Sequence, residues 1–142
     1  MKTIHVAAAV ILKDGKVYAT QRGYGDYKDG WEFPGGKIEL GETPAQALIR
    51  EIREELDIGI APEEKLCTVE SDYPAFRLRM ECFLCRMTEG MPVLKEHEAA
   101  RWLDAETLDS VDWLPADRAV LPQIRRVLQV RQGKAGGEGA ER

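Results

Sequence analysis

The sequence predicts a single α+β domain, an αβα sandwich in which a mixed sheet lies between helices. Three observations indicate this class: apolar strand-like runs at the start, one strongly patterned helix in the middle, and further strands before a last amphipathic helix. A length of 142 residues suits one domain. We expect that domain to span residues 1–132, and the glycine- and charge-rich residues 133–142 to form a disordered tail.

The first two strands are predicted from apolar runs at residues 4–12 and 16–22. An Asp-Gly pair at residues 14–15 separates them, which is typical of a tight hairpin turn. A glycine- and tyrosine-rich loop at 23–30 follows, and residues 31–36 then predict a short strand that enters a tight turn. The N-terminal third is therefore expected to be β structure.

The best-defined helix is predicted from Thr43 to Leu56. Thr43 is a favoured N-cap, Pro44 suits the first helical position, and Gln46 is placed to close a capping box. Asp57 is expected to end the helix in a left-handed conformation. The side chains expected to pack inward are Ala45, Leu48, Ile49, Ile52 and Leu56.

Alternating residues predict a pair of strands at 66–73 and 76–87, turned between them, and a short strand at 100–103. Residues 116–131 have the apolar spacing of an amphipathic helix. Cys82 and Cys85 have zinc-site spacing, but residues three apart on a strand face opposite sides, so we expect no metal there.

The overall composition excludes several classes of protein. A net charge of −5 disfavours binding to polymeric nucleic acid, whose phosphates require a cationic surface. No apolar run approaches the roughly 20 residues that span a bilayer. Three cysteines cannot all pair with one another, so we expect a reducing, cytoplasmic setting.

Three carboxylates gather on one edge of the predicted helix. Glu51, Glu54 and Glu55 fall within a sector of roughly 100° beside the inward face. Such a cluster of hard oxygen donors is what Mg²⁺ or Mn²⁺ requires. The alternative is a solvated helix surface on which these glutamates pair with Arg50 and Arg53.

The larger frame around these residues resembles the Nudix box, G-x5-E-x7-R-E-U-x-E-E-x-G-U, where U is aliphatic. The positions in register are Gly36, Glu42, Arg50, Glu51, Ile52, Glu54, Glu55 and Ile58. Asp57 departs from the pattern, which has glycine there, and we expect a small cost in stability. Residues 31–36 and 114–117 resemble the MutT and CTP pyrophosphohydrolase branch of the family, so the likeness extends over roughly residues 4–130.

The resemblance implies a divalent-metal hydrolase that converts nucleoside triphosphates to monophosphate and pyrophosphate, as a monomer or a homodimer. Mg²⁺ would be the cofactor, and Mn²⁺ would substitute for it. The implied metal ligands are the carbonyl of Gly35 and the side chains of Glu51, Glu54, Glu55 and Glu96. Glu51, Glu54, Arg50 and Glu96 would be the catalytic residues, with Glu42 steadying the loop. The resemblance leaves the general base open between Glu51 and Glu96, with Glu98 close behind Glu96.

Asp117 is the main clue to the substrate. By resemblance it would face the base, and an ionised carboxylate would accept from the amine of cytosine, so CTP or 5-methyl-dCTP is favoured. A turned, oxidised guanine such as that of 8-oxo-dGTP also fits. The alternative is that Asp117 caps the last helix. Further candidate substrate contacts are Arg22, Phe33, Phe76 and Lys37.

Two other functions stay open at this point. Pro74, which resembles a proline of some ADP-ribose hydrolases, keeps ADP-ribose or dinucleoside polyphosphates as alternative substrates. A nucleotide-binding module without turnover is the alternative outside enzymes. Turnover of ADP-ribose compared with CTP distinguishes the first, and hydrolysis with Mg²⁺ present excludes the second.

Overall fold

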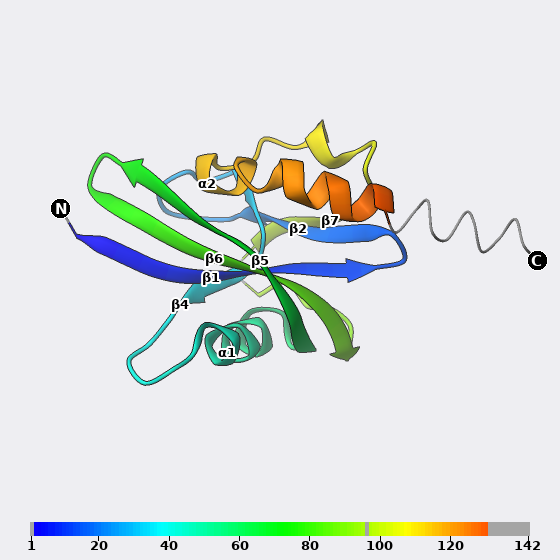
Figure 1. Cartoon of the computed structure of the whole chain (residues 1–142), viewed down its shortest axis with the longest axis horizontal. Coiled ribbons are helices and arrows are strands. Elements are labelled where there is room, and N and C mark those ends of the chain that lie inside the picture. The colour runs from blue at the N-terminus through cyan, green and yellow to red at the C-terminus, as the bar shows by residue number, and fades with distance from the viewer. Residues whose placement is uncertain (1, 96, 131–142) are drawn as a thin grey trace, which may run out of the picture.

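The structure is a computed structural model that describes residues 2–95 and 97–130 (Figure 1). Three sequence predictions lie outside the described part: the role of Glu96, the side chain of Glu98, and the disordered tail at 133–142.

Within the described residues, seven strands form one mixed sheet. Five of them are neighbours in the order β3-β2-β1-β6-β5, while β4 pairs with β1 and β7 pairs with β2. β1 and β6 are parallel, and the other pairs are antiparallel. The bounds are β1 Thr3–Lys13, β2 Lys16–Arg22, β3 Trp31–Glu32, β4 Gly35–Lys37, β5 Gly59–Tyr73, β6 Phe76–Glu89 and β7 His97–Leu103.

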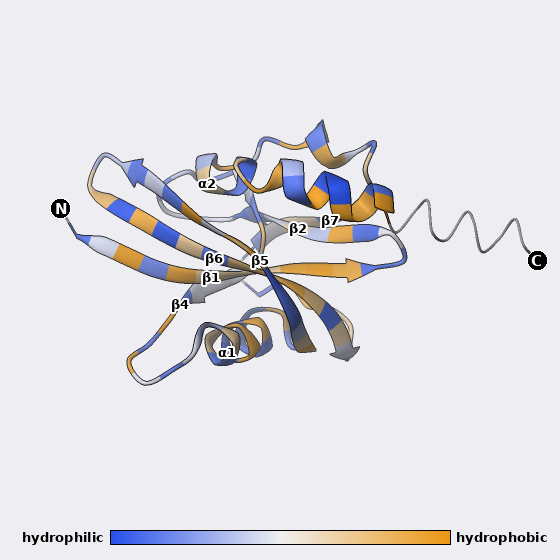
Figure 2. Ribbon diagram, viewed as in Figure 1, coloured by the Kyte–Doolittle hydropathy of each residue, from blue (hydrophilic) through white to orange (hydrophobic). Residues whose placement is uncertain are grey.

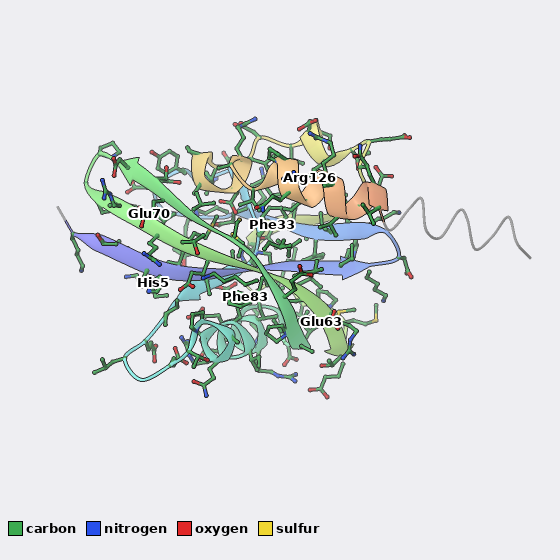
Figure 3. All side chains as sticks on the ribbon, in the orientation of Figure 1. His5, Phe33, Glu63, Glu70, Phe83 and Arg126 are labelled. Atoms are coloured by element: carbon green, nitrogen blue, oxygen red, sulfur yellow. The ribbon has the colours of Figure 1, made fainter. Side chains whose placement is uncertain are left out.

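Helices cover both faces of this sheet, which confirms the αβα sandwich (Figure 1). α1 (Pro44–Leu56) packs on one face; α2 (Pro115–Arg118), the 3-10 turn η1 (Leu108–Ser110) and a helix at 121–130 pack on the other. Each face has its own apolar core. Phe33 belongs to the core beneath α2, and Phe83 lies toward α1 (Figure 3).

The predicted start and end of α1 are confirmed. Thr43 accepts from the backbone N–H of Gln46 at 3.1 Å, and the Gln46 side chain accepts from the N–H of Thr43 at 2.9 Å. Asp57 ends the helix with φ 58°, the left-handed conformation. The inward face was partly wrong: Ala47 is buried, whereas Ile49 is 46% exposed and Ala45 half-buried.

The β structure follows the sequence closely. The first hairpin turns at residues 14–15, both with positive φ. Polar and apolar residues alternate along the first part of β6 (Figure 2). The apolar ones pack in the core beneath α2. Cys82 and Cys85 belong to opposite cores, as predicted. The prediction for β5 was too short: it begins at Gly59, and three register shifts interrupt its pairing with β6 and obscure the alternation.

The predicted helix at 116–131 is two helices. α2 ends at Arg118, and a second helix occupies 121–130. Pro122 explains the break, because it has no N–H to donate to the carbonyl of Arg118. The N–H of Val120 bonds instead to the carbonyl of Asp117 at 3.0 Å, a tighter turn between the helices.

Among the described residues, no helix is both long and apolar enough to cross a membrane.

Candidate active site

A cleft of about 620 Å³ opens between α1, the edge of the sheet and the loop that follows β2. This volume is within the range of small-molecule sites. Eight of the residues that the sequence singled out line it: Arg22, Phe33, Gly35, Gly36, Lys37, Glu55, Phe76 and Asp117. The candidate metal ligands lie toward α1 and β4, which we call the carboxylate end, and Asp117 lies at the other, which we call the base end.

At the carboxylate end, α1 packs directly on β4. Gly36 pairs with Ala7 of β1, and a Cβ on Gly36 would collide with the carboxylate of Glu51. Glycine at position 36 therefore lets the Glu51 carboxylate approach the backbone of β4. A Cβ on Gly35 would overlap the carbonyl of Ala7, so both glycines are required by close packing.

Arg50 organises the carboxylates around it. Its Nε donates to Glu42 Oε2 at 2.7 Å and its Nη1 donates to Glu51 Oε1 at 2.8 Å. Nη1 also reaches Glu54 Oε2 at 3.3 Å, while Nη2 donates to the carbonyl of Lys37 at 3.1 Å. One guanidinium thus fixes the strand, the loop and the helix that carry the candidate ligands.

This arginine network corrects one expectation. The sequence suggested carboxylates unpaired with arginine, but Glu51 and Glu54 both contact Arg50. Across the described residues, no three Asp, Glu, His or Cys side chains converge as a ready-made metal site. The donor set still fits a hard cation: Glu54 is 59% exposed, Glu55 lines the cleft, and Glu51 turns only one oxygen to Arg50.

The electrostatics of this end are those of an ion-pair network. Hydrogen bonds from Arg50 and from the N–H of Glu39 lower the pKa of Glu42 to about 2. The hydrogen bonds that Arg50 donates to Glu42 and Glu51 raise the pKa of Arg50. Glu42 is therefore ionised over the whole physiological range, and its carboxylate holds the loop at residues 39–42 closed.

At the base end, Asp117 is only 4% exposed. Its Oδ1 accepts from the backbone N–H of Phe33 at 2.9 Å. Burial raises the pKa of Asp117 to about 8, although that N–H and Arg22 partly oppose the shift. Burial therefore favours the protonated carboxyl at neutral pH, whereas the sequence argument took Asp117 as an ionised acceptor.

Asp117 does not cap α2, the first of the two helices in the predicted 116–131 segment, either. The N-cap of α2 is Leu114, whose side chain makes no capping bond, and Asp117 lies three positions further on. Its carboxyl instead ties α2 to the segment between β3 and β4 through Phe33. The structure thus favours a role for Asp117 in the cleft over the capping alternative.

Arg22 is directed at Glu32 rather than into open solvent. Its Nε and Nη2 donate to the two Glu32 carboxylate oxygens at 3.0 and 2.8 Å, and Nη1 donates to the carbonyl of Asp26 at 2.9 Å. Arg22 lines the cleft, so it remains near any ligand while it holds the loop after β2 in place.

The two phenylalanines differ. Phe33 is 3% exposed and stacks on Trp113 with ring centroids 4.5 Å apart, so it is mainly a core residue. Phe76 is half-buried and stacks on Tyr73, which in turn meets the edge of Tyr27. Tyr27, Tyr73 and Phe76 all line the cleft, and together they form an aromatic wall at its base end.

Comparison with known proteins assigns the chain to a family. The NUDIX domain family matches residues 2–124. The chain belongs to the NUDIX family. It is a Nudix hydrolase of the MutT-like branch.

Its relatives cover almost the whole domain. The 8-oxo-dGTP diphosphatase of Escherichia coli K12 is 34% identical over 134 residues, which are 89% of this chain and 100% of that protein. The CTP pyrophosphohydrolase of the same organism is also 34% identical, over 135 residues, 94% of this chain and 98% of that protein. The crystal structure of a MutT NUDIX hydrolase from Burkholderia pseudomallei superposes with a TM-score of 0.79 at 27% identity. The match covers 87% of this chain and 98% of that protein.

Sequence reasoning missed several residues of this Nudix cleft. Glu32, Tyr73 and His97 all line it. Tyr73 was predicted only as the end of a strand, and His97, which begins β7, lies before the strand predicted at 100–103. An aromatic pair flanking a predicted hairpin turn is the signal that could have identified Tyr73. Pro74, by contrast, is exposed in the turn between β5 and β6.

Proposed function

We propose that this Nudix hydrolase cleaves nucleoside triphosphates to nucleoside monophosphate and pyrophosphate, with Mg²⁺ as the preferred cation. The observation that carries the proposal is the shape of the cleft. One continuous cavity joins the carboxylate end, with Gly35 and Glu55, to the base end, with Phe76 and Asp117. A nucleotide is the kind of ligand that presents phosphates at one end and an aromatic base at the other.

In this proposal Glu51, Glu54 and Glu55, with the carbonyl of Gly35, hold the cation. When bound, the cation neutralises the phosphates and acidifies a water molecule. Arg50 keeps Glu51 against β4 through its bond to Oε1, and Glu42 keeps Arg50 in place. Arg50 and Glu42 therefore act as positioning residues. The proposed contributions of Glu96 and Lys37 are a further carboxylate and a charge near the phosphates.

The base end supports a guanine-type substrate at neutral pH. Because Oδ1 of Asp117 accepts from Phe33, a proton on the neutral carboxyl resides on Oδ2, where it can donate. The O6 oxygen of guanine accepts such a bond, whereas the amine of cytosine does not. We therefore propose 8-oxo-dGTP ahead of CTP and 5-methyl-dCTP, which reverses the order that an ionised Asp117 implied. The two E. coli relatives, equally identical to this chain, leave that order open.

The test is product analysis over a substrate panel. The purified full chain is incubated with Mg²⁺ and each of 8-oxo-dGTP, dGTP, CTP, 5-methyl-dCTP and ADP-ribose, and the products are separated by ion-exchange chromatography. The expected products are monophosphate and pyrophosphate, with the highest kcat/KM for 8-oxo-dGTP. Diphosphate with orthophosphate contradicts the proposed bond, and a large preference for ADP-ribose contradicts the substrate class.

A further inference from the structure

Two cysteines that the proposed chemistry does not use lie side by side on neighbouring strands. Cys67 of β5 is directly opposite Cys82 of β6 in the antiparallel register. Opposed residues project from the same face of a sheet, and both side chains pack into the core beneath α2. Cys82 is fully buried, while Cys67 is only half-buried.

The geometry of the pair is compatible with a covalent bond. The two thiols are within hydrogen-bonding reach of each other. Directly opposed residues in antiparallel strands have Cα atoms ~4.5–5.5 Å apart, inside the range that disulfides span. The pairing of β5 with β6 also shifts register between Lys65 and Cys67, and such an irregularity gives the edge strand local freedom to adjust.

We propose that Cys67 and Cys82 are a dithiol site that peroxide converts to an intramolecular disulfide tying edge strand β5 to β6. Nothing in this inference depends on which nucleotide the enzyme hydrolyses. Its chemical requirement is an oxidant of the hydroperoxide class and a thiol reductant for the reverse step.

The reaction takes two steps. The sulfur of Cys67, the more accessible of the two, attacks one oxygen of hydrogen peroxide, breaks the O–O bond and becomes a sulfenic acid with release of water. The sulfur of Cys82 then displaces the hydroxyl as a second water and forms the S–S bond. Two thiols are oxidised, one peroxide is reduced, and dithiothreitol reverses the reaction.

The environment predicts that this oxidation is slow and favoured by alkaline pH. Burial raises the pKa of both the Cys67 and the Cys82 thiol, so little thiolate is present at neutral pH. Proximity compensates once the sulfenic acid has formed, since the second thiol is already in contact with the first.

Cys85 provides a control within the same strand. It belongs to the opposite core beside α1, and its thiol donates to the carbonyl of Phe83 at 3.5 Å. The sheet separates it from Cys67. Burial raises the pKa of Cys85 to about 12, so it is also a poor nucleophile. It should remain reduced when the other two cysteines are oxidised.

The disulfide would brace the hairpin that supplies part of the aromatic wall. β5 ends at Tyr73 and β6 begins at Phe76; the turn at 74–75 joins them, and both rings line the cleft. Closing a loop of ~15 residues restricts the unfolded chain. We therefore expect the oxidised form to unfold at a temperature ~5–10 °C above that of the reduced form.

The experiment treats the reduced full chain with hydrogen peroxide at mildly alkaline pH and counts thiols by alkylation under denaturing conditions. The three thiols of the wild type should fall to one, with loss of two hydrogen atoms from the intact mass, and dithiothreitol should restore all three. Cys85→Ala should fall from two thiols to none. Cys67→Ala, which retains Cys82 and Cys85, should form no disulfide.

Peptide mapping identifies the bond. Trypsin separates Cys67 from the peptide that contains both Cys82 and Cys85, so the linkage is assigned by comparing the wild type with Cys85→Ala. A disulfide that survives in Cys67→Ala, or one that disappears in Cys85→Ala, overturns the proposal. So does a chain that is oxidised only to sulfinic acid or only to disulfide-linked dimers, or an oxidised form that melts below the reduced one.

Discussion

The two ends of the cleft are built in different ways. At the carboxylate end, Arg50 bonds to glutamates one, four and eight residues away in the sequence, all with partly exposed side chains. At the base end, Asp117 bonds to a backbone N–H 84 residues away, and Tyr73 meets Ala116 across 43 residues. The contacts of the carboxylate end are local and charged, while those of the base end join distant segments around two buried side chains, Tyr73 and Asp117.

This difference separates two kinds of function. A local network of ion pairs survives changes elsewhere in the fold, so the carboxylate end can stay constant while substrates differ. The base end depends on how α2 and the β5–β6 hairpin pack, and burial there raises the pKa of Asp117. We infer that chemistry resides at the first end and substrate choice at the second.

The largest effect is expected from Glu51→Gln, which tests whether the chemistry resides at the carboxylate end. We expect kcat to fall by ~10²–10³-fold, because one of the charges that hold the cation is lost. The apparent melting temperature should change little, since the amide can still accept from Arg50. Steady-state kinetics with Mg²⁺ and calorimetric unfolding together make the measurement.

Glu64→Gln is the matched control. Glu64 is an exposed carboxylate on β5 that is absent from the lining of the cleft, and its removal changes net charge equally. Wild-type rates are expected for this variant. Wild-type rates in Glu51→Gln as well would show that the cation is held elsewhere.

The same contrast explains how much the sequence could predict. The α1 cap, the left-handed Asp57 and the glutamate cluster lie within one stretch of fifteen residues, 43–57, where spacing alone defines geometry. Spacing left open whether the glutamates face a cation or pair with arginine, because side-chain direction is not encoded in spacing; the structure pairs Glu51 and Glu54 with Arg50. Gly36 was placed in the motif, but its steric reason required the position of β4 against α1.

The base end was only partly accessible to sequence reasoning. Asp117 was correctly singled out as a cleft residue, yet its protonation depends on burial by segments distant in the chain. The Tyr27, Tyr73 and Phe76 wall likewise joins a loop and a hairpin that are far apart in sequence. The break between α2 and the helix at 121–130 could have been predicted from the sequence, because Pro122 has no N–H to donate to the carbonyl of Arg118.

Asp117→Asn sharpens the comparison from the other end. Asparagine donates a hydrogen bond at every pH, whereas the wild-type carboxyl loses its proton as the pH rises through about 8. For 8-oxo-dGTP, the ratio of kcat/KM in Asp117→Asn to that in wild type should therefore rise ~10-fold between about pH 7 and pH 9. Taking the ratio cancels effects of pH on the carboxylate end, which both proteins share.

The sign for stability follows from the same shift. The folded-state pKa of Asp117 lies above its unfolded value, so the folded protein binds the proton more tightly. Wild-type stability should then decline between about pH 4 and pH 8 relative to Asp117→Asn. A pH-independent ratio of kcat/KM, or a wild type that gains on 8-oxo-dGTP as it ionises, would mean that Asp117 accepts from the base rather than donating to it.

The smallest predicted effect concerns Asp57, the one departure from the Nudix pattern. With φ 58° it occupies a left-handed conformation that glycine adopts without strain. We expect Asp57→Gly to increase the free energy of unfolding by ~0.5–1 kcal/mol, and Asp57→Ala to decrease it by a similar amount. Urea titration measures both.

Neither Asp57 variant should change kcat, because the Asp57 side chain is exposed and is not among the residues that line the cleft. This outcome would confine the departure from the family pattern to the end of α1, one turn beyond the glutamates. If Asp57→Gly instead altered kcat, the end of α1 and the carboxylates would be coupled. The backbone carbonyl of Asp57 lies next to Gly90, in the segment between β6 and β7. The end of α1 thus contacts a distant part of the chain, and through this contact the carboxylate end would depend on the wider fold, as the base end does.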